Sequence, residues 1–243
     1  MKKLLENLVE KNKVHAKEGK LASYIPALME ANPEAVGICV VDLKDKYEFW
    51  AGDSDVKFTI QSISKVVSLI IALNDNGRTN VFSKVNVEPT GMGFNSIVNL
   101  EAAMENRPYN PMINAGAIVT TSLIFGETEE RKLERILNFM RRATNNPHIG
   151  INEEIYLNEK ATGDRNRALA YYMKSTGALE GDVEEVLDLY FKQCSIEATA
   201  RDLARFGAVI ANDGVTPWSN EVLMSRDICR IVKTIMVTCG MYD

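Results

Sequence analysis

The sequence contains only two histidines, and neither stands in a pattern that hydrolysis or metal binding would use. His15 lies in a mixed-charge segment and His148 in a polar stretch. No Gly-x-Ser-x-Gly is present to hold a serine on the strained turn of a Ser-His-Asp hydrolase. Neither Cys-x-x-Cys nor His-Glu-x-x-His is present to bind a metal ion. We therefore expect neither a histidine-dependent triad nor a metal site.

Long apolar runs and an excess of basic residues are also lacking. No segment approaches the roughly 18 consecutive apolar residues of a membrane span. The basic start Met1-Lys2-Lys3 leads into a mixed-charge segment and not into the apolar core of a signal peptide. The 28 Lys and Arg residues are outnumbered by 33 Asp and Glu, and the resulting net charge of −5 argues against nucleic acid or an anionic membrane as a partner.

Cysteine is scarce and forms no recognisable framework. Cys39, Cys194, Cys229 and Cys239 are widely spaced and lie in apolar surroundings. This pattern favours reduced, mostly buried thiols over disulfides. We therefore expect a cytoplasmic protein.

The length of the chain, 243 residues with 46% apolar content, is enough for a sizeable core. No internal repeat, low-complexity linker or composition shift marks a boundary, so we expect one domain over residues 1–243. Residues 2–15 carry apolar side chains at helical spacing and predict an amphipathic helix, and a short helix near residues 24–28 follows. Residues 35–42 predict a buried strand that pairs with residues 47–51 across a turn.

The remainder of the chain is predicted to be mostly helical. Residues 56–60 predict a short extended segment, and the periodicity after Gly77 predicts helices over 114–125, 129–144, 164–174, 182–193, 197–211 and 226–238. Two strands followed by helices is an unusual inventory, because a lone hairpin is marginally stable. We therefore expect the sheet to be completed by chain beyond Asp243 or by a partner.

One stretch carries a chemical pattern, the segment Gln61-Ser62-Ile63-Ser64-Lys65 that opens an apolar run. Its spacing predicts a buried helix that begins near Ser62, which places Ser62 and Lys65 on one face. A neutral lysine can serve as the base that activates a serine, and burial together with the helix dipole should lower the lysine pKa. Ser-x-x-Lys is the nucleophile motif of the penicillin-recognising enzymes.

Short motifs of this kind also occur by chance. A second copy, Ser54-Asp55-Val56-Lys57, lies in a polar turn before a strand-like run, and we interpret it as structural. For Ser62 the structural alternative is a helix N-cap followed by a solvated lysine.

Three further stretches admit both a structural and a functional interpretation. Asn114, at the start of an apolar helix, is either a cap beside small packing residues or an amide presented to a ligand. Glu159 and Asn166 flank a glycine turn and either belong to a salt-bridged loop or hold an amino-acid headgroup, with Glu159 on the ammonium. Tyr190 is either a core aromatic or a ligand contact.

In their order along the chain, these stretches resemble the signature segments of the serine-dependent glutaminase family, bacterial type. The resemblance runs from about Tyr24 to Asp243. The matching blocks are Tyr24-Ile25-Pro26, Gln61-Ser62-Ile63-Ser64-Lys65, Asn110-Pro111-Met112-Ile113-Asn114-Ala115-Gly116-Ala117, Glu159 with Gly163-Asp164-Arg165-Asn166, Leu187-Asp188-Leu189-Tyr190-Phe191 with Cys194-Ser195-Ile196-Glu197, and Cys239-Gly240-Met241-Tyr242-Asp243.

The resemblance implies a β-lactamase/transpeptidase-like α/β (α+β) fold, in which an antiparallel sheet flanked by helices meets a helical lobe at the site. It implies hydrolysis of L-glutamine to L-glutamate and ammonia without metal or cofactor, in a homo-oligomer that is a dimer or a tetramer. Ser62 would be the nucleophile and Lys65 its activating partner, and Tyr242 and Tyr24 would transfer protons. The substrate would be held by Ser62, Asn114, Glu159, Asn166, Tyr190 and Tyr242.

The sequence departs from the family pattern in one place. In the family, a strand pair and a Lys-Ser-Gly-Val-Gly-Gly segment follow the block that here ends at Asp243, and the valine supplies a backbone N–H to the oxyanion hole. The resemblance therefore implies C-terminal strands that are missing from this sequence. We expect a protein that ends at Asp243 to release little ammonia and to be less stable than an extended form.

Two other functions stay open at this point. One is another Ser-x-x-Lys amidohydrolase or penicillin-binding relative, although the Ser-Asp-Asn and Lys-Thr-Gly motifs of those enzymes are absent. The other is a non-catalytic amino-acid-binding module. Ammonia release, nitrocefin hydrolysis and calorimetric binding distinguish the three.

Overall fold

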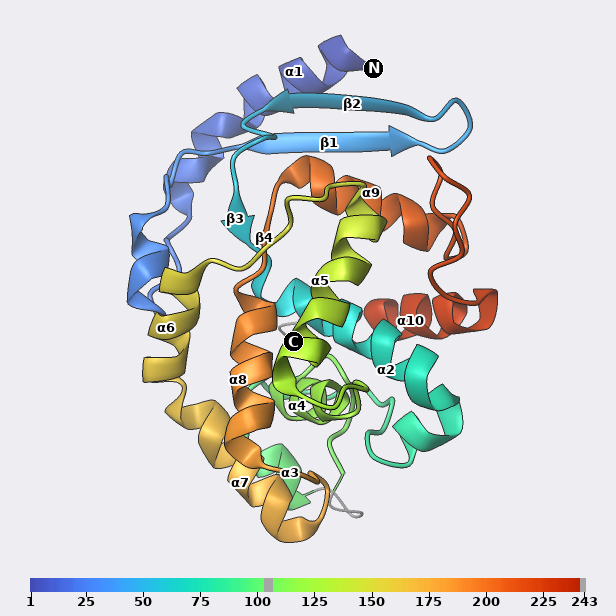
Figure 1. The fold of residues 1–243 in the computed structure, drawn as a ribbon. Coiled ribbons are helices and arrows are strands. Elements are labelled where there is room, and N and C mark those ends of the chain that lie inside the picture. Colours follow the sequence, from blue (N-terminus) through green and yellow to red (C-terminus); the bar gives the residue numbers. More distant parts are fainter. Residues whose placement is uncertain (103–106, 241–243) are drawn as a thin grey trace.

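The computed structural model describes residues 1–102 and 107–240 (Figure 1). Its strands are short: β1 (Gly37–Asp42), β2 (Tyr47–Gly52), β3 (Phe58–Thr59) and β4 (Glu197–Ala198). Its 3-10 helices are η1 (Lys13–Glu18), η2 (Pro26–Glu30) and η3 (Gln61–Ile63). Its α-helices are α1 (Lys2–Asn12), α2 (Ser64–Phe82), α3 (Val98–Ala102), α4 (Asn114–Ser122), α5 (Glu129–Thr144), α6 (Glu153–Thr162), α7 (Asp164–Thr176), α8 (Val183–Cys194), α9 (Ala200–Ala211) and α10 (Arg226–Cys239).

The predicted hairpin is confirmed. β1 and β2 are antiparallel, with Gly37 opposite Gly52 and Asp42 opposite Tyr47. Helix α1 packs along β2 and helix α9 along β1, so the hairpin lies between two helices (Figure 1).

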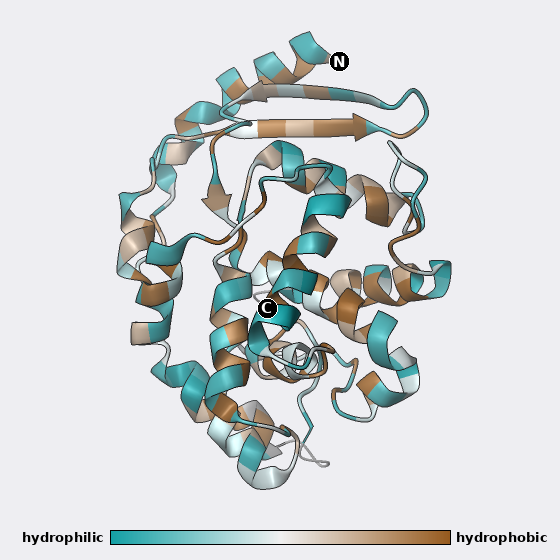
Figure 2. Cartoon of the chain, viewed as in Figure 1, coloured by the Kyte–Doolittle hydropathy of each residue, from teal (hydrophilic) through white to brown (hydrophobic). Residues whose placement is uncertain are grey.

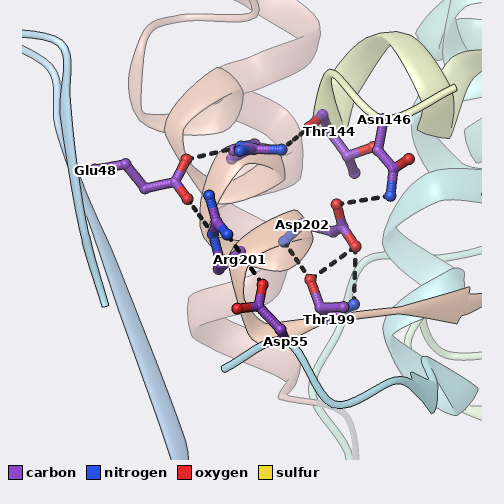
Figure 3. A network of polar contacts seen from close by, with 8 residues as sticks. Glu48, Asp55, Thr144, Asn146, Thr199, Arg201 and Asp202 are labelled. Carbon is purple, nitrogen blue, oxygen red and sulfur yellow. Dashed lines mark hydrogen bonds and ion pairs between the residues drawn. The ribbon is translucent and has the colours of Figure 1, made fainter. Parts of the chain in front are cut away.

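A polar network attaches this hairpin to α9. The carboxylate of Glu48 on β2 accepts a hydrogen bond from Arg201 (2.5 Å) and one from Arg205 (2.8 Å), and Arg201 also donates to Asp55 at 3.0 Å (Figure 3). The guanidinium of Arg201 lies 4.1 Å from the ring centroid of Trp50, a cation–π contact on the same strand. These contacts hold the hairpin on the helical body at the point where the chain turns toward β3.

A second, very short strand pair was not predicted. Within the predicted extended segment 56–60, only Phe58 and Thr59 form a strand, and Ile60 already has a helical backbone as the N-cap of η3. Strand β3 pairs antiparallel with β4, which places Phe58 opposite Ala198. The backbone N–H of Ile60 then donates to the carbonyl of Ile196 at 2.9 Å. This pairing brings the residues before Ser62 against the residues that follow α8.

The same pairing corrects one predicted helix. We expected a helix over 197–211, but α9 begins at Ala200 because the first two residues belong to β4. Thr199 then caps the helix in a capping box: its hydroxyl accepts from the backbone N–H of Asp202, and the Asp202 carboxylate accepts from the backbone N–H of Thr199 (Figure 3).

Helix α2 lies at the centre of the molecule. Every residue from Ser64 to Leu73 is buried, and the helix packs against α4, α5 and α10. Gly77 interrupts the helix with φ 70° and ψ 164°, a backbone conformation that residues other than glycine rarely adopt. The surface helices α1 and α10 carry both apolar and polar residues, as their colouring shows (Figure 2).

A second apolar cluster forms the helical lobe. It joins Ile118 of α4, Leu169 and Met173 of α7, and Leu187 and Phe191 of α8. The predicted α+β architecture, an antiparallel hairpin with flanking helices and a helical lobe, is thus confirmed.

Two further expectations can be compared with the described residues. No helix within 1–102 and 107–240 is long and apolar enough to cross a membrane. All four cysteines are free thiols, and all but Cys39 are buried, as predicted.

Candidate active site

A cavity of about 290 Å³ lies where η3, α4, α6, α7 and α8 converge, a volume suited to one small ligand. Most of the residues singled out in the sequence as candidates line it together, although they come from distant parts of the chain. The lining residues are Tyr24, Ile25, Gln61, Ser62, Phe94, Asn95, Asn114, Glu159, Thr162, Gly163, Arg165, Asn166, Tyr190 and Cys194.

Ser62 lies at the cavity wall, in the 3-10 turn η3 that continues directly into α2. The residue before it, Gln61, has a left-handed backbone with φ 45°, a strained conformation of the kind that clusters at functional sites. The Gln61 side chain is fixed at both ends, because its amide donates to Thr59 Oγ1 at 2.9 Å and its carbonyl accepts from Tyr24 Oη at 3.1 Å. Ser62 is therefore presented on a rigid turn.

Lys65 lies one turn further along and is fully buried. Its Nζ donates to the carbonyl oxygen of Met112 at 2.8 Å and lies 5.4 Å from the centroid of the Phe94 ring. In the described part of the chain its hydrogen bond goes to Met112 and not to Ser62. Burial lowers the pKa of Lys65 to about 8, the direction that the sequence predicted. At pH 7, on the order of a tenth of the molecules therefore have a neutral amine at Lys65.

The loop that faces Lys65 owes its shape to Asn110. Its Oδ1 accepts hydrogen bonds from the backbone N–H groups of Met112 (2.9 Å) and Ile113 (3.2 Å). Gly116 permits this loop to approach α4, because a Cβ there would lie 1.9 Å from the carbonyl oxygen of Asn110. The sequence offered two interpretations of this stretch, close helix packing by small residues or an amide presented to a ligand. Gly116 fits the first of these, because it packs against the backbone of Asn110. Asn114, in contrast, lines the cavity.

Glu159 lies in the C-terminal half of α6 and is only 7% exposed. Its Oε2 has no hydrogen-bond partner among the described residues. Burial raises the pKa of Glu159 to about 8, and a hydrogen bond with Cys194 lowers it in part. A buried carboxylate with an open acceptor atom at a cavity wall is suited to bind a cationic group of a ligand.

Three more candidates complete the polar wall. The amide of Asn114 donates to Asn166 Oδ1 at 2.9 Å, and Asn114 Oδ1 is buried without a partner among the described residues. Tyr190 is 2% exposed, and burial raises the pKa of its phenol well above 10, so it stays a neutral hydroxyl. These groups offer donors and acceptors for a polar ligand.

A charged cluster behind the cavity fixes α6 relative to α8. Asp188 of α8 accepts from Tyr156 Oη at 2.7 Å and forms ion pairs with Lys160 and Lys192. Burial alone would raise the pKa of Asp188, but the hydrogen bonds from Lys160, Lys192 and Tyr156 hold it well below its usual range. The ion pair between Lys160, next to Glu159, and Asp188, two residues before Tyr190, thereby holds the two helices together near the cavity.

Seven of the eight predicted site residues can be placed. Tyr242 lies outside the described residues. Lys65 is buried beside the cavity, and the other six line it. The second Ser-x-x-Lys copy does not reach the cavity, since Ser54 is buried elsewhere and Lys57 pairs at the surface with Glu197 at 3.7 Å.

Sequence reasoning missed several lining residues. Cys194 was taken for an ordinary buried thiol, and Gln61 for part of the motif without a role of its own. Phe94 and Asn95 lie in a loop without a motif, and Arg165 belongs to the stretch that the sequence left open as a salt-bridged loop. In the structure Arg165 donates instead to the carbonyl of Asn95 at 2.8 Å. Within 1–102 and 107–240, no three His, Cys, Asp or Glu side chains converge in a way that could hold a metal ion.

Comparisons with known proteins agree on one family. A family model described as Glutaminase matches residues 19–243. The chain is 62% identical over 243 residues to "Glutaminase 2" of Clostridium perfringens (strain 13 / Type A), a match that covers all of this chain and 79% of that protein. It is 57% identical to "Glutaminase" of Clostridium botulinum (strain Loch Maree / Type A3), with the same shares covered.

Solved structures give the same result. A probable glutaminase from Bacillus subtilis complexed with 6-diazo-5-oxo-L-norleucine is 40% identical with a TM-score of 0.87, over 98% of this chain and 72% of that one. A covalent complex between a Bacillus subtilis glutaminase and 5-oxo-L-norleucine, formed by reaction with 6-diazo-5-oxo-L-norleucine, is 40% identical with a TM-score of 0.88, over 99% and 76%.

Proposed function

The chain belongs to the glutaminase family and is an amidohydrolase of L-glutamine, and from this premise we propose that Ser62 and Lys65 carry out the hydrolysis through an acyl-enzyme. The α+β fold is consistent with the β-lactamase-like class. One observation carries the proposal: Ser62 lines the same cavity as Glu159, a buried carboxyl group whose Oε2 has no hydrogen-bond partner among the described residues.

The proposed binding mode follows from the charges of the substrate. L-Glutamine is a zwitterion with a neutral side-chain amide. Glu159 binds the ammonium through Oε2, which has no partner among the described residues, while Asn114 and Asn166 offer amide groups to the carboxylate. Tyr190 contributes its hydroxyl, and Tyr242 is proposed from the resemblance alone. The side-chain amide then extends toward Ser62.

The proposed chemistry has two steps. In the first, Ser62 Oγ forms a bond to the side-chain carbonyl carbon, the neutral amine of Lys65 takes the hydroxyl proton, and ammonia leaves with a proton returned to its nitrogen. In the second, water adds to the ester and Ser62 leaves with a proton, which gives L-glutamate. Tyr24, whose hydroxyl reaches Gln61 beside Ser62, is proposed to take part in these proton transfers, as is Tyr242. The covalent complex of the Bacillus subtilis relative supports a covalent route.

Ammonia release by the full-length protein tests the proposal. We expect turnover of L-glutamine, no hydrolysis of nitrocefin, and a covalent mass increase when the protein reacts with 6-diazo-5-oxo-L-norleucine. Peptide mapping should locate that adduct on Ser62. An adduct on another residue would contradict the assignment.

The Glu159→Gln variant tests the binding role of the carboxylate. The substitution keeps the shape and removes the negative charge, so we expect KM for L-glutamine to rise on the order of 10²-fold, since loss of one partner of a buried charged pair is costly. The fold should persist, because a neutral amide is cheaper to bury than a carboxylate. The matched control is Glu154→Gln, an exposed change on the same helix that should leave KM unaltered. An unchanged glutamine affinity in Glu159→Gln would refute the role.

The pH dependence of kcat/KM tests both titrating groups together. The reaction needs Lys65 neutral and Glu159 ionised, and both have a pKa of about 8 in the free protein. Both changes are losses of a proton, so log kcat/KM should rise with pH at a slope of about two below pH 8. Above pH 8 the rise should end, and kcat/KM should fall once the α-ammonium of the substrate loses its own proton. In Glu159→Gln only Lys65 still titrates, and the slope should fall to about one. A flat profile between pH 6 and 8 would contradict the assignment of both groups.

Three properties remain predictions. The single domain over residues 1–243, the homo-oligomer and the cytoplasmic location rest on the resemblance and on composition. Light scattering of the purified full-length protein distinguishes a monomer from the expected dimer or tetramer.

A further inference from the structure

The aromatic ring of Phe94 lies beside the amine of Lys65. The Lys65 Nζ is 5.4 Å from the centroid of this ring, within the distance at which a cation is attracted to the face of an aromatic ring. Phe94 belongs to the loop between α2 and α3, and it also lines the cavity. The hydrolysis proposed above gives this ring no role.

Two hydrogen bonds hold the backbone of the loop at this point. The carbonyl of Phe94 accepts from the backbone N–H of Asn114 at 2.8 Å, and the carbonyl of Asn95 accepts from Arg165 Nε at 2.8 Å. The donors are the first residue of α4 and a residue in the first turn of α7. Phe94 also packs against the apolar cluster of the helical lobe. Contacts with two helices therefore fix the ring beside Lys65.

The charged form of Lys65 has few other partners. An ammonium carries three N–H donors, and in the described part of the chain Nζ donates to one acceptor, the carbonyl of Met112 at 2.8 Å. No carboxylate within 1–102 and 107–240 contributes to the pKa shift of this lysine. Because the side chain is fully buried, solvent stabilises its charge poorly. The ring face of Phe94 is thus a second group that can stabilise the ammonium.

We propose that Phe94 is a positioning residue for Lys65, and that the face of its ring stabilises the ammonium that forms when the amine takes the proton from Ser62 Oγ. This inference rests on the proposed role of Lys65 as the base. In that step a positive charge develops at Nζ, and the negative face of the ring is already in place for it. The ring interacts much less with the neutral amine, so its presence makes Lys65 a stronger base.

The structural alternative is that Phe94 only excludes water, and it predicts the opposite effect on the titration of Lys65. A smaller apolar side chain would then admit water to the amine, and the pKa of Lys65 would rise toward its ordinary value. If the ring face stabilises the ammonium, a side chain without a ring should lower the pKa further. The direction of the change in a Phe94→Leu variant therefore separates the two.

The measurement must report Lys65 alone. The charged and titratable groups that share the cavity with Phe94 are Tyr24, Glu159, Arg165, Tyr190 and Cys194. Burial raises the pKa of Tyr190 and of Cys194 well above their ordinary values, so both keep their protons. Helices α4, α5 and α10 pack against α2, and in the described part of the chain they bring no charged group that shifts the pKa of Lys65.

Glu159 is the one group with a pKa in the same range as that of Lys65, and a kinetic constant separates the two. The pH dependence of kcat reports the enzyme–substrate complex, in which the ammonium of glutamine keeps Glu159 ionised. The acid limb of kcat, the part of the profile that rises with pH, should therefore follow Lys65. Measurement at saturating glutamine also removes any effect of Phe94 on substrate binding.

The experiment measures kcat of the full-length protein on L-glutamine between about pH 6 and 9. In Phe94→Leu we expect the acid limb to move by about 0.5–1 pH unit toward lower pH, and kcat on the plateau to fall a few-fold because Lys65 is a weaker base. Phe94→Tyr keeps the ring and should keep the position of the limb. Phe125→Leu is the matched control, since Phe125 is 56% exposed and does not line the cavity.

Fluorinated phenylalanines in place of Phe94 give a second test that nearly preserves the shape of the side chain. Each fluorine withdraws charge from the ring face, so the limb should move stepwise to lower pH from mono- to di- to trifluorinated rings. The inference is overturned if the limb ignores fluorination, or if Phe94→Leu leaves it in place or moves it to higher pH. If Lys65→Met still hydrolyses glutamine, the failure lies instead in the proposed role of Lys65.

Discussion

Replacement of Ser62 by alanine is expected to abolish glutamine hydrolysis by the full-length protein, with a loss of about 10⁴-fold or more in kcat, the cost typical of removing a covalent nucleophile. Glutamine should still bind, because the groups proposed to hold the headgroup, Glu159 and Asn114, are on other helices. The variant should also lose its covalent reaction with 6-diazo-5-oxo-L-norleucine. Ammonia release, calorimetry and intact-mass measurement together check the three expectations.

Ser54 provides the control within the same chain. It also precedes a lysine by three residues, but it is buried away from the cavity, and its Oγ has no hydrogen-bond partner among the described residues. Ser54→Ala should therefore leave turnover unchanged and cost little stability, since it removes a buried hydroxyl that makes no bond. Loss of activity in Ser54→Ala with activity kept in Ser62→Ala would reverse the assignment.

Features of the fold that depend on neighbouring residues could be predicted from the sequence. Helix α5 begins and ends at the predicted residues, because Thr128 caps its N-terminus and Asn145 takes the left-handed conformation at its C-terminus. The hairpin followed from two apolar segments around a short turn. The buried run after Ser62 likewise predicted the central helix.

Features that depend on distant residues could not be predicted. The pairing of β3 with β4 joins Phe58 to Ala198, and strands of two residues carry no periodicity. Helix α6 was overlooked because its polar sequence shows little amphipathic pattern, although Asn152 at its N-cap was a usable signal. Since α6 carries Glu159, the sequence indicated the residue through a motif but not the element that positions it.

The candidate site likewise combines features that the sequence indicated with features that only contacts between distant residues create. The resemblance indicated residues by type and order, and six of them do line one cavity. It did not indicate Cys194, because a cysteine among apolar neighbours looks like core until the tertiary structure places it beside Ser64 at the cavity wall. It also gave no sign that Lys65 would bond to the carbonyl of Met112.

Replacement of Lys65 by methionine is expected to remove activity and, at the same time, to leave the fold as stable as before or more stable at pH 7. Methionine has a similar length but cannot accept a proton, so we expect kcat to fall on the order of 10³-fold or more. Lys57→Met is the control, an exposed lysine of the second motif copy whose loss should not affect turnover.

The stability half of this prediction follows from the lowered pKa. Lys65 titrates at about 8 in the folded protein against 10.5 for the free side chain. Below pH 8 both states are protonated and the cost of the buried ammonium is fully present, about 3 kcal/mol from the difference in pKa. Between pH 8 and 10.5 the folded state loses its proton first, so the unfolded state binds more protons and stability rises with pH.

Methionine removes both the charge and this pH dependence. Against the relief of about 3 kcal/mol stands the unpaired carbonyl of Met112, which costs about 1–3 kcal/mol. The free energy of unfolding at pH 7 should therefore stay level or rise by up to about 2 kcal/mol, and the gain should disappear by about pH 10. Denaturant unfolding of both proteins at pH 7 and pH 10 measures this. A Lys65→Met variant that is inactive but clearly less stable at pH 7 would show that the lysine supports the fold, and that its lost activity says nothing about proton transfer.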